Sequence, residues 1–399
     1  MTRFRSQIDS SLKKKLPVLV TLLIGINLLI GCTKKNTTEK VVIIDKPEVI
    51  TPTIDSLSKD EFDEFYHIFD STFTKLQKTR QFNGVVLGGK KKQIVFKKAF
   101  GYRDIRRRTK LRDDDIFQLA SVSKQFTAAS IMLLAQDTLL AYSDSINKYF
   151  PDFPYDGITI KMLLDHRSGL PNYIYLMDRK IKDKHTYINN DLCVDYLYEY
   201  KPGKYGTPDK RFRYSNTGYM LLAEIVEKVS GKTFAEFLDE RIFTPLHMDS
   251  TFTFENERAH QENVAIGHSS GRRKYEDYLL DGVLGDKSVY SNVEDMFKWH
   301  VALLQDSLFK QETLDEAFTF QSPKRRGNYN YGYGWRLFHV SDGTTVVYHG
   351  GWWRGYSTLF VHYPETEAFL MILSNRVNHA FVNTNNVFNI LEIPEFRRR

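Results

Sequence analysis

The chain has 399 residues, of which 42% are hydrophobic and 26% charged, and it shows no internal repeat or low-complexity block. That length is ample for a large core, in one domain of two lobes or in two close-packed domains. The formal net charge is +7, but residues 1–31 contribute +4 through five basic residues and Asp9, so little charge remains to support nucleic-acid binding.

The N-terminus reads as a secretion signal. A basic start precedes an apolar run over residues 16–30, which contains Pro17 and is short for a transmembrane helix. Its Leu-Ile-Gly-Cys ending resembles a bacterial lipoprotein signal, which implies cleavage of residues 1–31 and a lipid on the Cys32 thiol. The alternative is an uncleaved membrane anchor. Either way we expect the rest of the chain outside the cytoplasm, in the periplasm or on a bacterial cell surface. Cys193 would then be the one free thiol, without a disulfide within the chain.

Both ends of the remaining chain predict strands. Residues 32–58 are rich in Lys, Thr, Pro and Asp and are expected to form a tether. Apolar residues at helical spacing then predict a helix over 60–78, and Gly88-Gly89-Lys90 is a hairpin signal. The predicted strands lie over 82–87, 93–100, 344–348, 356–363 and 368–373, and a last helix over 377–391.

The middle of the chain is mostly helical, with predicted helices over 160–164, 217–229, 234–242 and 293–304. Strands at both ends with helices between them favour one antiparallel sheet completed by both ends. The predicted fold class is therefore α+β, an antiparallel sheet of five or more strands flanked by helices, plus a mostly helical lobe. We expect one globular domain over 59–395, with a sheet lobe from about 59–118 and 335–395 and a helical lobe from about 119–334.

Small residues followed by an apolar run, from Phe117 to Ala135, predict a helix buried on most sides. Ser121 and Lys124 stand three residues apart in it, so the hydroxyl and the amine share one helix face. Burial in an apolar helix favours the neutral amine, and the positive end of the helix dipole favours both the neutral amine and the ionised hydroxyl. The pair is therefore interpreted as an activated nucleophile. The same spacing occurs at four other serines, but only Ser121 lies in an apolar helix.

A second motif, Tyr214-Ser215-Asn216, comes directly before a predicted helix. Asn216 is well placed as the N-cap of that helix, and this is the simplest interpretation. In the alternative interpretation, the phenol of Tyr214 and the amide of Asn216 face the Ser121 helix.

A third motif, His349-Gly350-Gly351-Trp352, follows the predicted strand that ends at Tyr348. Glycines at a strand end would let a substrate backbone approach the strand edge closely. The plainer interpretation is a strand-end histidine followed by a turn.

The order of these three motifs resembles the serine β-lactamase and penicillin-binding-protein superfamily. It is most similar to the branch with class C β-lactamases, D-alanyl-D-alanine carboxypeptidases, D-aminopeptidases and related esterases. The resemblance covers most of residues 80–376. It includes flanking stretches at 82–87 (FNGVVL), 100–104 (FGYRD), 158–171 (ITIKMLLDHRSGLP) and 331–335 (YGYGW).

The resemblance implies that Ser121 is the acylated nucleophile. It also implies that Lys124 and Tyr214 share the proton transfers, with Tyr214 helping to activate water for deacylation. Which group is the acylation base stays open, as it does for related motifs.

The resemblance further implies a set of substrate-binding residues. Asn216 would hold the substrate's amide side chain. The backbone N–H groups of Ser121 and Trp352 would form the oxyanion hole. His349 and Gly351 would lie on the strand beside the substrate.

The third motif departs from the Lys-Thr-Gly of β-lactamases and most penicillin-binding enzymes, because His349 and Gly350 replace the lysine and the threonine. A histidine is only partly charged near neutral pH, and glycine has no hydroxyl. This weakens the case for carboxylate recognition and for β-lactamase activity, whereas esterases and D-peptidases of the family share the His-x-Gly form. Trp352 and Trp353 are candidates either for an aromatic wall of the substrate site or for buried packing.

Two interpretations from other classes are the alternatives. Gly267–Gly271 fits the G-x-S-x-G elbow of α/β-hydrolases, but Ser269 precedes basic residues, and the His-Gly-Gly run comes after it instead of before. We therefore expect Ser269 in a loop. A non-catalytic binding protein of the cell envelope on the same scaffold is the other alternative, and turnover of an acyl ester separates it from an enzyme. No metal-ligand spacing or phosphate-binding glycine loop occurs, so neither a metal nor a cofactor is predicted.

The sequence thus predicts a lipid-anchored serine hydrolase that works through an acyl-enzyme without a cofactor. Its expected substrates are D-amino-acid peptides or esters, with cell-wall peptides among the candidates. A membrane is the expected partner through the lipid, and no nucleic acid is expected. The acyl acceptor and the oligomeric state are not specified by the sequence.

Overall fold

In a computed structural model of the chain, the described residues are 57–305, 307–322, 327–377 and 384–396. They belong to one compact unit, Thr51–Arg399. The expected signal, Cys32 and nearly all of the expected tether lie outside the described residues. Within the described part of the chain, no helix is both long enough and apolar enough to cross a bilayer.

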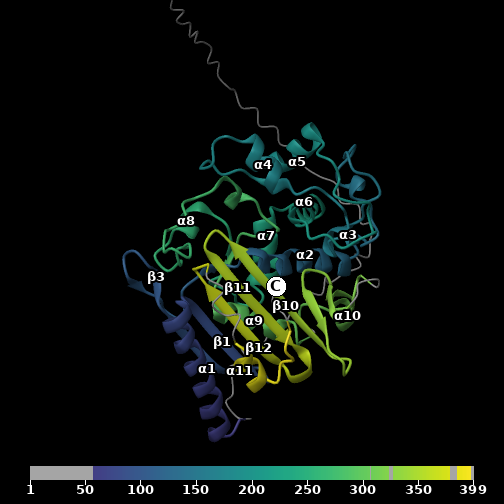
Figure 1. Ribbon diagram of the computed structural model, residues 1–399. Helices are drawn as coiled ribbons and strands as arrows, with labels where there is room; N and C mark the ends of the chain where they lie inside the picture. The colour runs from purple at the N-terminus through teal and green to yellow at the C-terminus, as the bar shows by residue number, and fades with distance from the viewer. Residues whose placement is uncertain (1–56, 306, 323–326, 378–383, 397–399) are drawn as a thin grey trace, which may run out of the picture. The chain divides into compact units, whose positions relative to one another are not determined.

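A seven-stranded antiparallel sheet forms one half of this unit, and it confirms the predicted α+β class (Figure 1). Its strand order is β2-β1-β12-β11-β10-β9-β8, so strands from both ends of the chain pair in the middle, where β1 lies beside β12. The strands are β1 (Gly84–Lys90), β2 (Gln93–Phe100), β8 (Tyr329–Tyr331), β9 (Arg336–His339), β10 (Thr345–Trp353), β11 (Tyr356–Tyr363) and β12 (Ala368–Ser374).

Three details of the sheet differ from the sequence-based expectation. The first hairpin turns at Lys91 and Lys92, which have φ of 53° and 59°, and the glycines at 88 and 89 lie inside β1. A Cβ on Gly88 would sit 2.5 Å from the Phe69 ring, so this glycine allows a helix to pack closely on the strand. Strands β8 and β9, which begin at Tyr329 and Arg336, were not predicted. Strand β10 continues through the third motif to Trp353.

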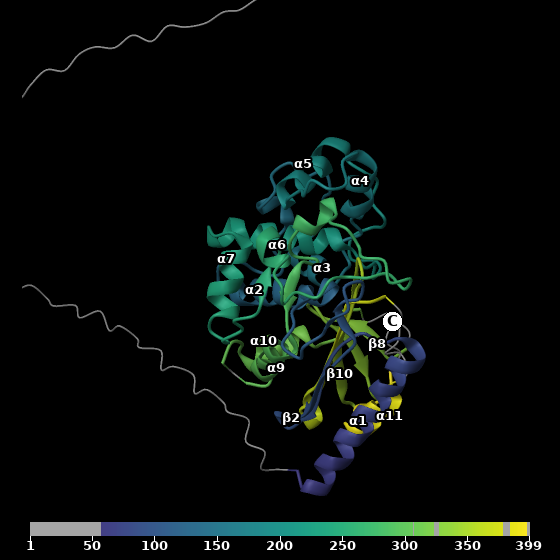
Figure 2. The ribbon, with the colours of Figure 1, turned by 90° about the vertical axis from the view of Figure 1, so that its left-hand side faces the viewer.

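Helices cover both faces of the sheet (Figure 2). On one face lie α1 (Lys59–Arg80) and α11 (Asn385–Ile390). Helix α1 packs with β2 and with α11 around a phenylalanine-rich cluster. Helix α11 lies within the helix predicted over 377–391, of which residues 378–383 lie outside the described residues. On the other face, α9 (Val293–Ala302) contacts β1 and β12, and the larger core extends from there into the helical region.

The helical region contains more helices than the sequence predicted, because α4 (Tyr173–Lys180), α5 (Asn190–Tyr200), α8 (Asn256–Ala259) and α10 (Gln311–Ala317) were missed. Helix α6 ends at Gly231, which adopts φ 71° as its left-handed cap, as expected for a helix stopped by glycine. The remaining helices are α2 (Lys124–Gln136), α3 (Ile160–Leu164), α6 (Asn216–Ser230) and α7 (Phe234–Leu238).

A small three-stranded sheet also lies in this region, with β7 (Val289–Ser291) between β5 (Phe117–Gln118) and β6 (Phe252–Thr253). The predicted helix from Phe117 is therefore wrong at its start. Phe117 and Gln118 pair with β7 because a β-ladder partner, distant in sequence, overrides the local pattern.

Candidate active site

Ser121 lies on a short 3₁₀ helix, η1 (Ala120–Ser123), that connects β5 to α2. Lys124 is the first residue of α2, and its Nζ lies 3.3 Å from Ser121 Oγ. Ala120, directly before the serine, has φ 51°, a left-handed conformation that costs a non-glycine residue about 1 kcal/mol. Backbone strain of this kind concentrates at functional sites. The structure thus brings together the two groups that the sequence singled out.

Lys124 is fully buried, and the ten residues that follow it in α2 are buried as well. Its Nζ donates a hydrogen bond of 2.5 Å to the backbone carbonyl of Asp286 and lies 5.0 Å from the centroid of the Tyr214 ring. No ion pair joins it to a carboxylate of the described residues. An amine held only by neutral groups beside a hydroxyl is well placed to exchange a proton with it.

The second motif differs from its simplest interpretation, because the N-cap position of α6 is Ser215 and Asn216 is the first helical residue. The Oδ1 atom of Asn216 and the hydroxyl of Tyr214 are buried, and neither has a hydrogen-bond partner among the described residues. Buried polar atoms are rarely left unpaired in proteins, and exceptions are concentrated where a ligand binds. Both side chains are therefore free to bind a substrate, as the alternative interpretation requires.

The third motif lies on an unpaired edge of the sheet. Strand β9 pairs with β10 only from Thr345 to Tyr348, whereas the following residues pair only with β11 within the described part of the chain. Arg354 and Gly355 form the two-residue turn between β10 and β11, with φ of 35° and 97°. Trp353 and Tyr356 are then a hydrogen-bonded pair, and by alternation the N–H of Trp352 points away from β11, toward the free edge. This is the direction that an oxyanion donor requires.

Gly351 allows the free edge to approach the serine segment. A Cβ on Gly351 would lie 2.3 Å from the carbonyl oxygen of Leu119 and 3.1 Å from the Cβ of Ala120. The sequence suggested that this glycine makes room for a substrate, whereas its contact is with the chain's own nucleophile segment. Because side chains alternate along a strand, Trp352 points to the opposite face and its side chain is 57% exposed. Trp352 therefore contributes its backbone N–H to the site, whereas the side chain of Trp353 is the one on the face of the serine segment.

His349 is fully buried and neutral. Burial, with Arg336 and Lys124 nearby, holds the pKa of His349 well below its usual value. Its Nδ1 lies 2.8 Å from the carbonyl oxygen of Gly350, which can only accept, so Nδ1 carries the proton. Its Nε2 then accepts a 3.0 Å hydrogen bond from the hydroxyl of Tyr331. A neutral histidine held in this way cannot replace the charge of a lysine in the third motif.

Arg336 is a functional candidate that the sequence reasoning missed. It is the first residue of β9 and pairs with Tyr348, directly before the third motif. Its guanidinium carbon lies 5.5 Å from the centroid of the Tyr214 ring. Its Nε is buried, and its side chain makes no hydrogen bond or ion pair with the described residues. The signal was available, since Arg336 immediately follows the stretch at 331–335 that carries the family resemblance.

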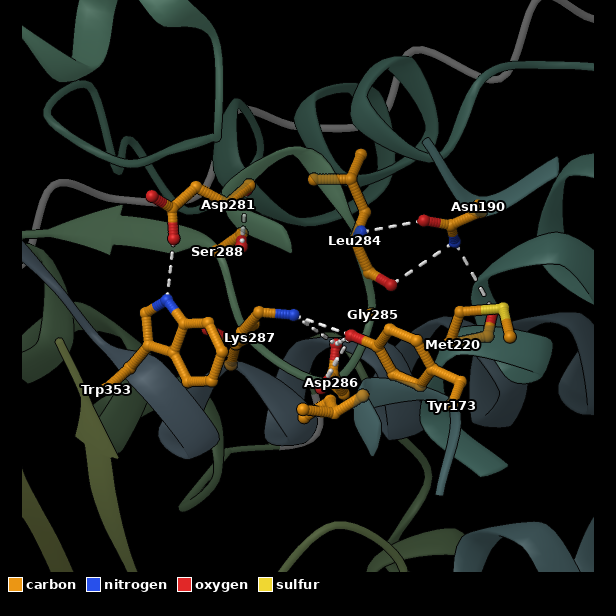
Figure 3. Close-up of polar contacts among 12 residues, drawn as sticks. Tyr173, Asn190, Met220, Asp281, Leu284, Gly285, Asp286, Lys287, Ser288 and Trp353 are labelled. Carbon is orange, nitrogen blue, oxygen red and sulfur yellow. Dashed lines mark hydrogen bonds and ion pairs between the residues drawn. The ribbon is translucent and has the colours of Figure 1, made fainter. Parts of the chain in front are cut away.

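The carbonyl that binds Lys124 belongs to a firmly held segment, shown in Figure 3. The Asp286 carboxylate accepts hydrogen bonds from the Tyr173 hydroxyl at 3.1 and 3.2 Å, and it forms a buried ion pair of 3.2 Å with Lys287. Lys287 also donates a 2.6 Å hydrogen bond to the Tyr173 hydroxyl. On its other side, Lys287 lies 4.8 Å from the centroid of the Trp353 ring. This network fixes the Asp286 peptide and, through it, Lys124.

The rival nucleophile lies elsewhere. Ser269 is in a loop, as expected, and its hydroxyl accepts a 3.1 Å hydrogen bond from the backbone N–H of Arg273. The structure thus provides no elbow between a strand and a helix at this serine.

An α+β fold with a serine, a lysine and a tyrosine gathered beside one free strand edge is typical of serine hydrolases of the penicillin-binding type. A sequence profile of the Beta-lactamase family matches residues 69–393. The chain belongs to that family and is a serine hydrolase of it.

Known proteins agree with this assignment. The chain is 35% identical to penicillin-binding protein 4* of Bacillus subtilis over 322 residues, which cover 76% of this chain and 70% of the relative. It is 27% identical to the teichoic acid D-alanine hydrolase of Staphylococcus aureus over 311 residues, 75% of this chain and 73% of that one. The solved structure of an octameric penicillin-binding protein homologue from Pyrococcus abyssi shares the fold, with a TM-score of 0.70 over 81% of this chain and 76% of that chain at 24% identity.

Proposed function

We propose that the chain is a lipid-anchored serine peptidase or esterase that cleaves D-amino-acid peptides or esters outside the cytoplasm. The observation that carries the substrate class is the guanidinium of Arg336, a permanent charge without a carboxylate partner among the described residues, beside Tyr214 and His349. Arginine suits a carboxylate because its planar donors match both oxygens. A substrate with a free carboxylate on its leaving group, such as a peptide that ends in D-alanine, fits this charge.

The proposed reaction has two steps. In the first, Ser121 Oγ attacks the carbonyl carbon of the D-residue while its proton passes to Lys124 or Tyr214, and the N–H groups of Ser121 and Trp352 bind the oxyanion. Tyr214 lies on the Arg336 side and would pass the proton to the leaving group. In the second step water attacks the acyl-enzyme, with Tyr214 taking its proton. Asn216 would hold the substrate's amide through its unpartnered Oδ1.

The relatives support the same substrate class. One of them is named as a D-alanine hydrolase of teichoic acid. His349 and Gly350 replace the lysine and the threonine of the β-lactamase motif, and this departure supports a peptidase or esterase over a β-lactamase.

The location is proposed from the N-terminal sequence. A basic start, an apolar run and Cys32 fit a lipoprotein signal, so we place the lipid on Cys32. Labelled palmitate fed to bacteria that express the full chain should enter the wild-type protein and not a Cys32→Ser variant. Equal labelling of both would contradict the anchor.

Adduct mapping tests the enzyme. The purified full chain is incubated with a fluorophosphonate and, separately, with a penicillin, and the modified peptide is located by mass spectrometry. We expect the fluorophosphonate on Ser121 and hydrolysis of a peptide that ends in D-alanyl-D-alanine, both lost in Ser121→Ala. Hydrolysis that survives Ser121→Ala would end the mechanism. Faster turnover of penicillins than of D-peptides would overturn the substrate class and favour a β-lactamase.

A further inference from the structure

A cavity of about 560 Å³ lies near Ser121 but is not lined by Ser121, Lys124 or Tyr214. Its walls come from the segment that holds β3 (Tyr102–Asp104) and β4 (Thr109–Lys110), from loops between residues 254 and 281, and from the turn after β10. Neither the sequence motifs nor the proposed reaction uses this cavity.

Two buried side chains in the cavity wall have polar ends without a partner. Gln118 on β5 and Tyr290 on β7 are directly opposite each other in the small sheet, and only 1% and 5% of their surfaces are exposed. Neither the Gln118 amide nor the Tyr290 hydroxyl makes a hydrogen bond with the described residues. The Tyr290 ring is fixed by stacking on Phe252, with centroids 5.3 Å apart. Neither polar end is among the fully enclosed polar atoms of the described residues, so both are open to the cavity that they line. The pair therefore has the character of a preformed hydrogen-bonding site.

Opposite charges flank this pair. The Arg354 guanidinium donates to the backbone carbonyl of Glu276 at 2.6 Å and forms no ion pair with the described residues. The Asp281 carboxylate accepts 2.7 and 2.9 Å hydrogen bonds from Trp353 Nε1 and from the Tyr278 N–H, and it has no cationic partner within ion-pair distance in the described part of the chain. Burial raises the pKa of Asp281 above its usual value. The cavity thus offers an amide, a phenol, a cation and a carboxylate together.

The cavity adjoins both segments that carry the oxyanion donors. Gln118 is three residues before Ser121, a span of at most about 10 Å. Arg354 is two residues after Trp352. Figure 3 shows the hydrogen bond between Trp353 and Asp281, with Lys287 beside the Trp353 ring. Of these three residues, Asp281 lines the cavity. An occupant of the cavity would therefore contact the chain three residues before one oxyanion donor and two residues after the other.

We propose that this cavity binds a peptide. The Gln118 amide both donates and accepts and so matches a peptide bond, whereas Arg354 and Asp281 match a chain that carries both signs of charge. A neutral glycan has no charged groups to pair with Arg354 and Asp281. The peptide could be the amino-terminal part of the substrate itself or a second molecule. For the first of these two sources, the inference rests on the proposed function. In that function the leaving group lies on the Arg336 and Tyr214 side, so the acyl part extends toward Trp353.

The experiment separates the two sources of peptide, the substrate and a second molecule. In one arm, kcat/KM is measured for a thioester of N-acetyl-D-alanine and for the same thioester extended at its amino end by a glutamyl-lysyl dipeptide. In the other arm, the free amide Glu-Lys-Ala-NH₂ is added to the short thioester. Extension should raise kcat/KM about tenfold if the substrate occupies the cavity, as expected for two or more new hydrogen bonds. A second peptide as occupant would leave the extension without effect but change turnover of the short thioester.

Variants identify the site. Gln118→Leu and Tyr290→Phe together remove both polar ends while keeping the side-chain volume. In this double variant, the kcat/KM of the extended thioester divided by that of the short thioester should fall to about one. If a second peptide is the occupant, turnover of the short thioester should be the same with and without added peptide. Tyr175→Phe is the matched control, because Tyr175 is 64% exposed and does not line the cavity. The proposal is overturned if neither arm shows an effect, or if the double variant keeps it.

Failure of the proposed function gives a different result. In that case the short thioester is not cleaved in a Ser121-dependent way. Binding of Glu-Lys-Ala-NH₂ to the full-length Ser121→Ala chain is then measured by calorimetry. Binding that disappears in the Gln118 and Tyr290 variant supports the cavity site, and absence of binding overturns it.

Discussion

The hydroxyl of Tyr331 lies 3.0 Å from Nε2 of His349 and donates to it, which leaves the imidazole neutral with both nitrogens occupied. Since the pKa of His349 is well below its usual range, the ring stays neutral across the pH range in which a free histidine gains charge. A substrate carboxylate therefore gains no attraction from His349 when the pH falls.

We expect the preference for a D-peptide with a free carboxylate over its C-terminal amide to stay constant between about pH 8 and pH 6. The measurement is the ratio of the two kcat/KM values across that range. A ratio that rises as the pH approaches 6 would show that His349 becomes charged and would contradict the hydrogen-bond assignment.

Arg336 should supply that preference instead. Arg336→Gln should lower the ratio of carboxylate to amide kcat/KM by about 10- to 100-fold, because hydrogen bonds to charged groups contribute about 1.5–3 kcal/mol. Arg336→Lys is the control that keeps the charge and should retain part of the preference. An unchanged ratio in Arg336→Gln would remove the carboxylate from the proposed substrate.

Gly351→Ala should reduce kcat by about 10²–10³-fold, the usual cost of a lost oxyanion donor. The new Cβ would meet Thr358 Oγ1 at 2.2 Å and the Leu119 carbonyl at 2.3 Å, and so would push β10 away from the serine segment. Gly350→Ala is a matched control, because its Cβ would contact only the Thr358 carbonyl, at 3.7 Å. Equal losses in both variants would show that the close approach at Gly351 is unimportant.

Removing one partner of the buried ion pair in Figure 3 should lower the free energy of unfolding strongly, whereas replacing both partners should lower it much less. Lys287→Met leaves the Asp286 carboxylate buried with only the Tyr173 hydroxyl, and the free energy of unfolding should fall by about 3–5 kcal/mol. The double variant Asp286→Asn with Lys287→Met leaves no unpaired charge and should recover most of this loss in denaturant titrations. If the double variant is as unstable as the single one, the loss comes from packing and not from charge.

The buried histidine pair His300 and His362 should make stability depend on pH. Their Nδ1 atoms lie 2.8 Å apart, and burial lowers the pKa of His362 to about 3. Below about pH 6.5 the unfolded chain binds a proton at this histidine and the folded chain does not, so the free energy of unfolding falls as the pH falls. Between about pH 6 and pH 4.5, the slope should be smaller in His362→Leu by about 1.4 kcal/mol per pH unit. Parallel slopes for the two proteins would contradict a neutral His362.

The α+β class and the positions of Ser121, Lys124 and Tyr214 could be predicted because they depend on local patterns and on a resemblance that covers most of the chain. The ends of helices and strands were less predictable where pairing with a segment distant in sequence determines them. Phe117 and Gln118 looked helical beside the apolar run, yet they pair with β7, which is more than 150 residues away in sequence.

Gln118 and Tyr290 could not be assigned roles from the sequence, and Arg336 could be noticed only through its place after the stretch at 331–335. The significance of all three lies in the partners that they lack among the described residues. An unpaired guanidinium or amide is a property of the folded surroundings, and no periodicity reports it. The role of Gly351 was misjudged for a related reason, since only the fold shows that the neighbour it admits is the chain's own Leu119 and not a ligand.

The unpaired edge of β10 has a further consequence for the protein at high concentration. Free strand edges are templates on which other chains can add a strand, and proteins usually protect them with charges, prolines or a covering loop. Here such protection would obstruct the Trp352 N–H. The exposed side chain of Trp352 adds an apolar surface beside the edge, which favours self-association. Resistance to self-association and access for the substrate are therefore opposing demands on the same few residues.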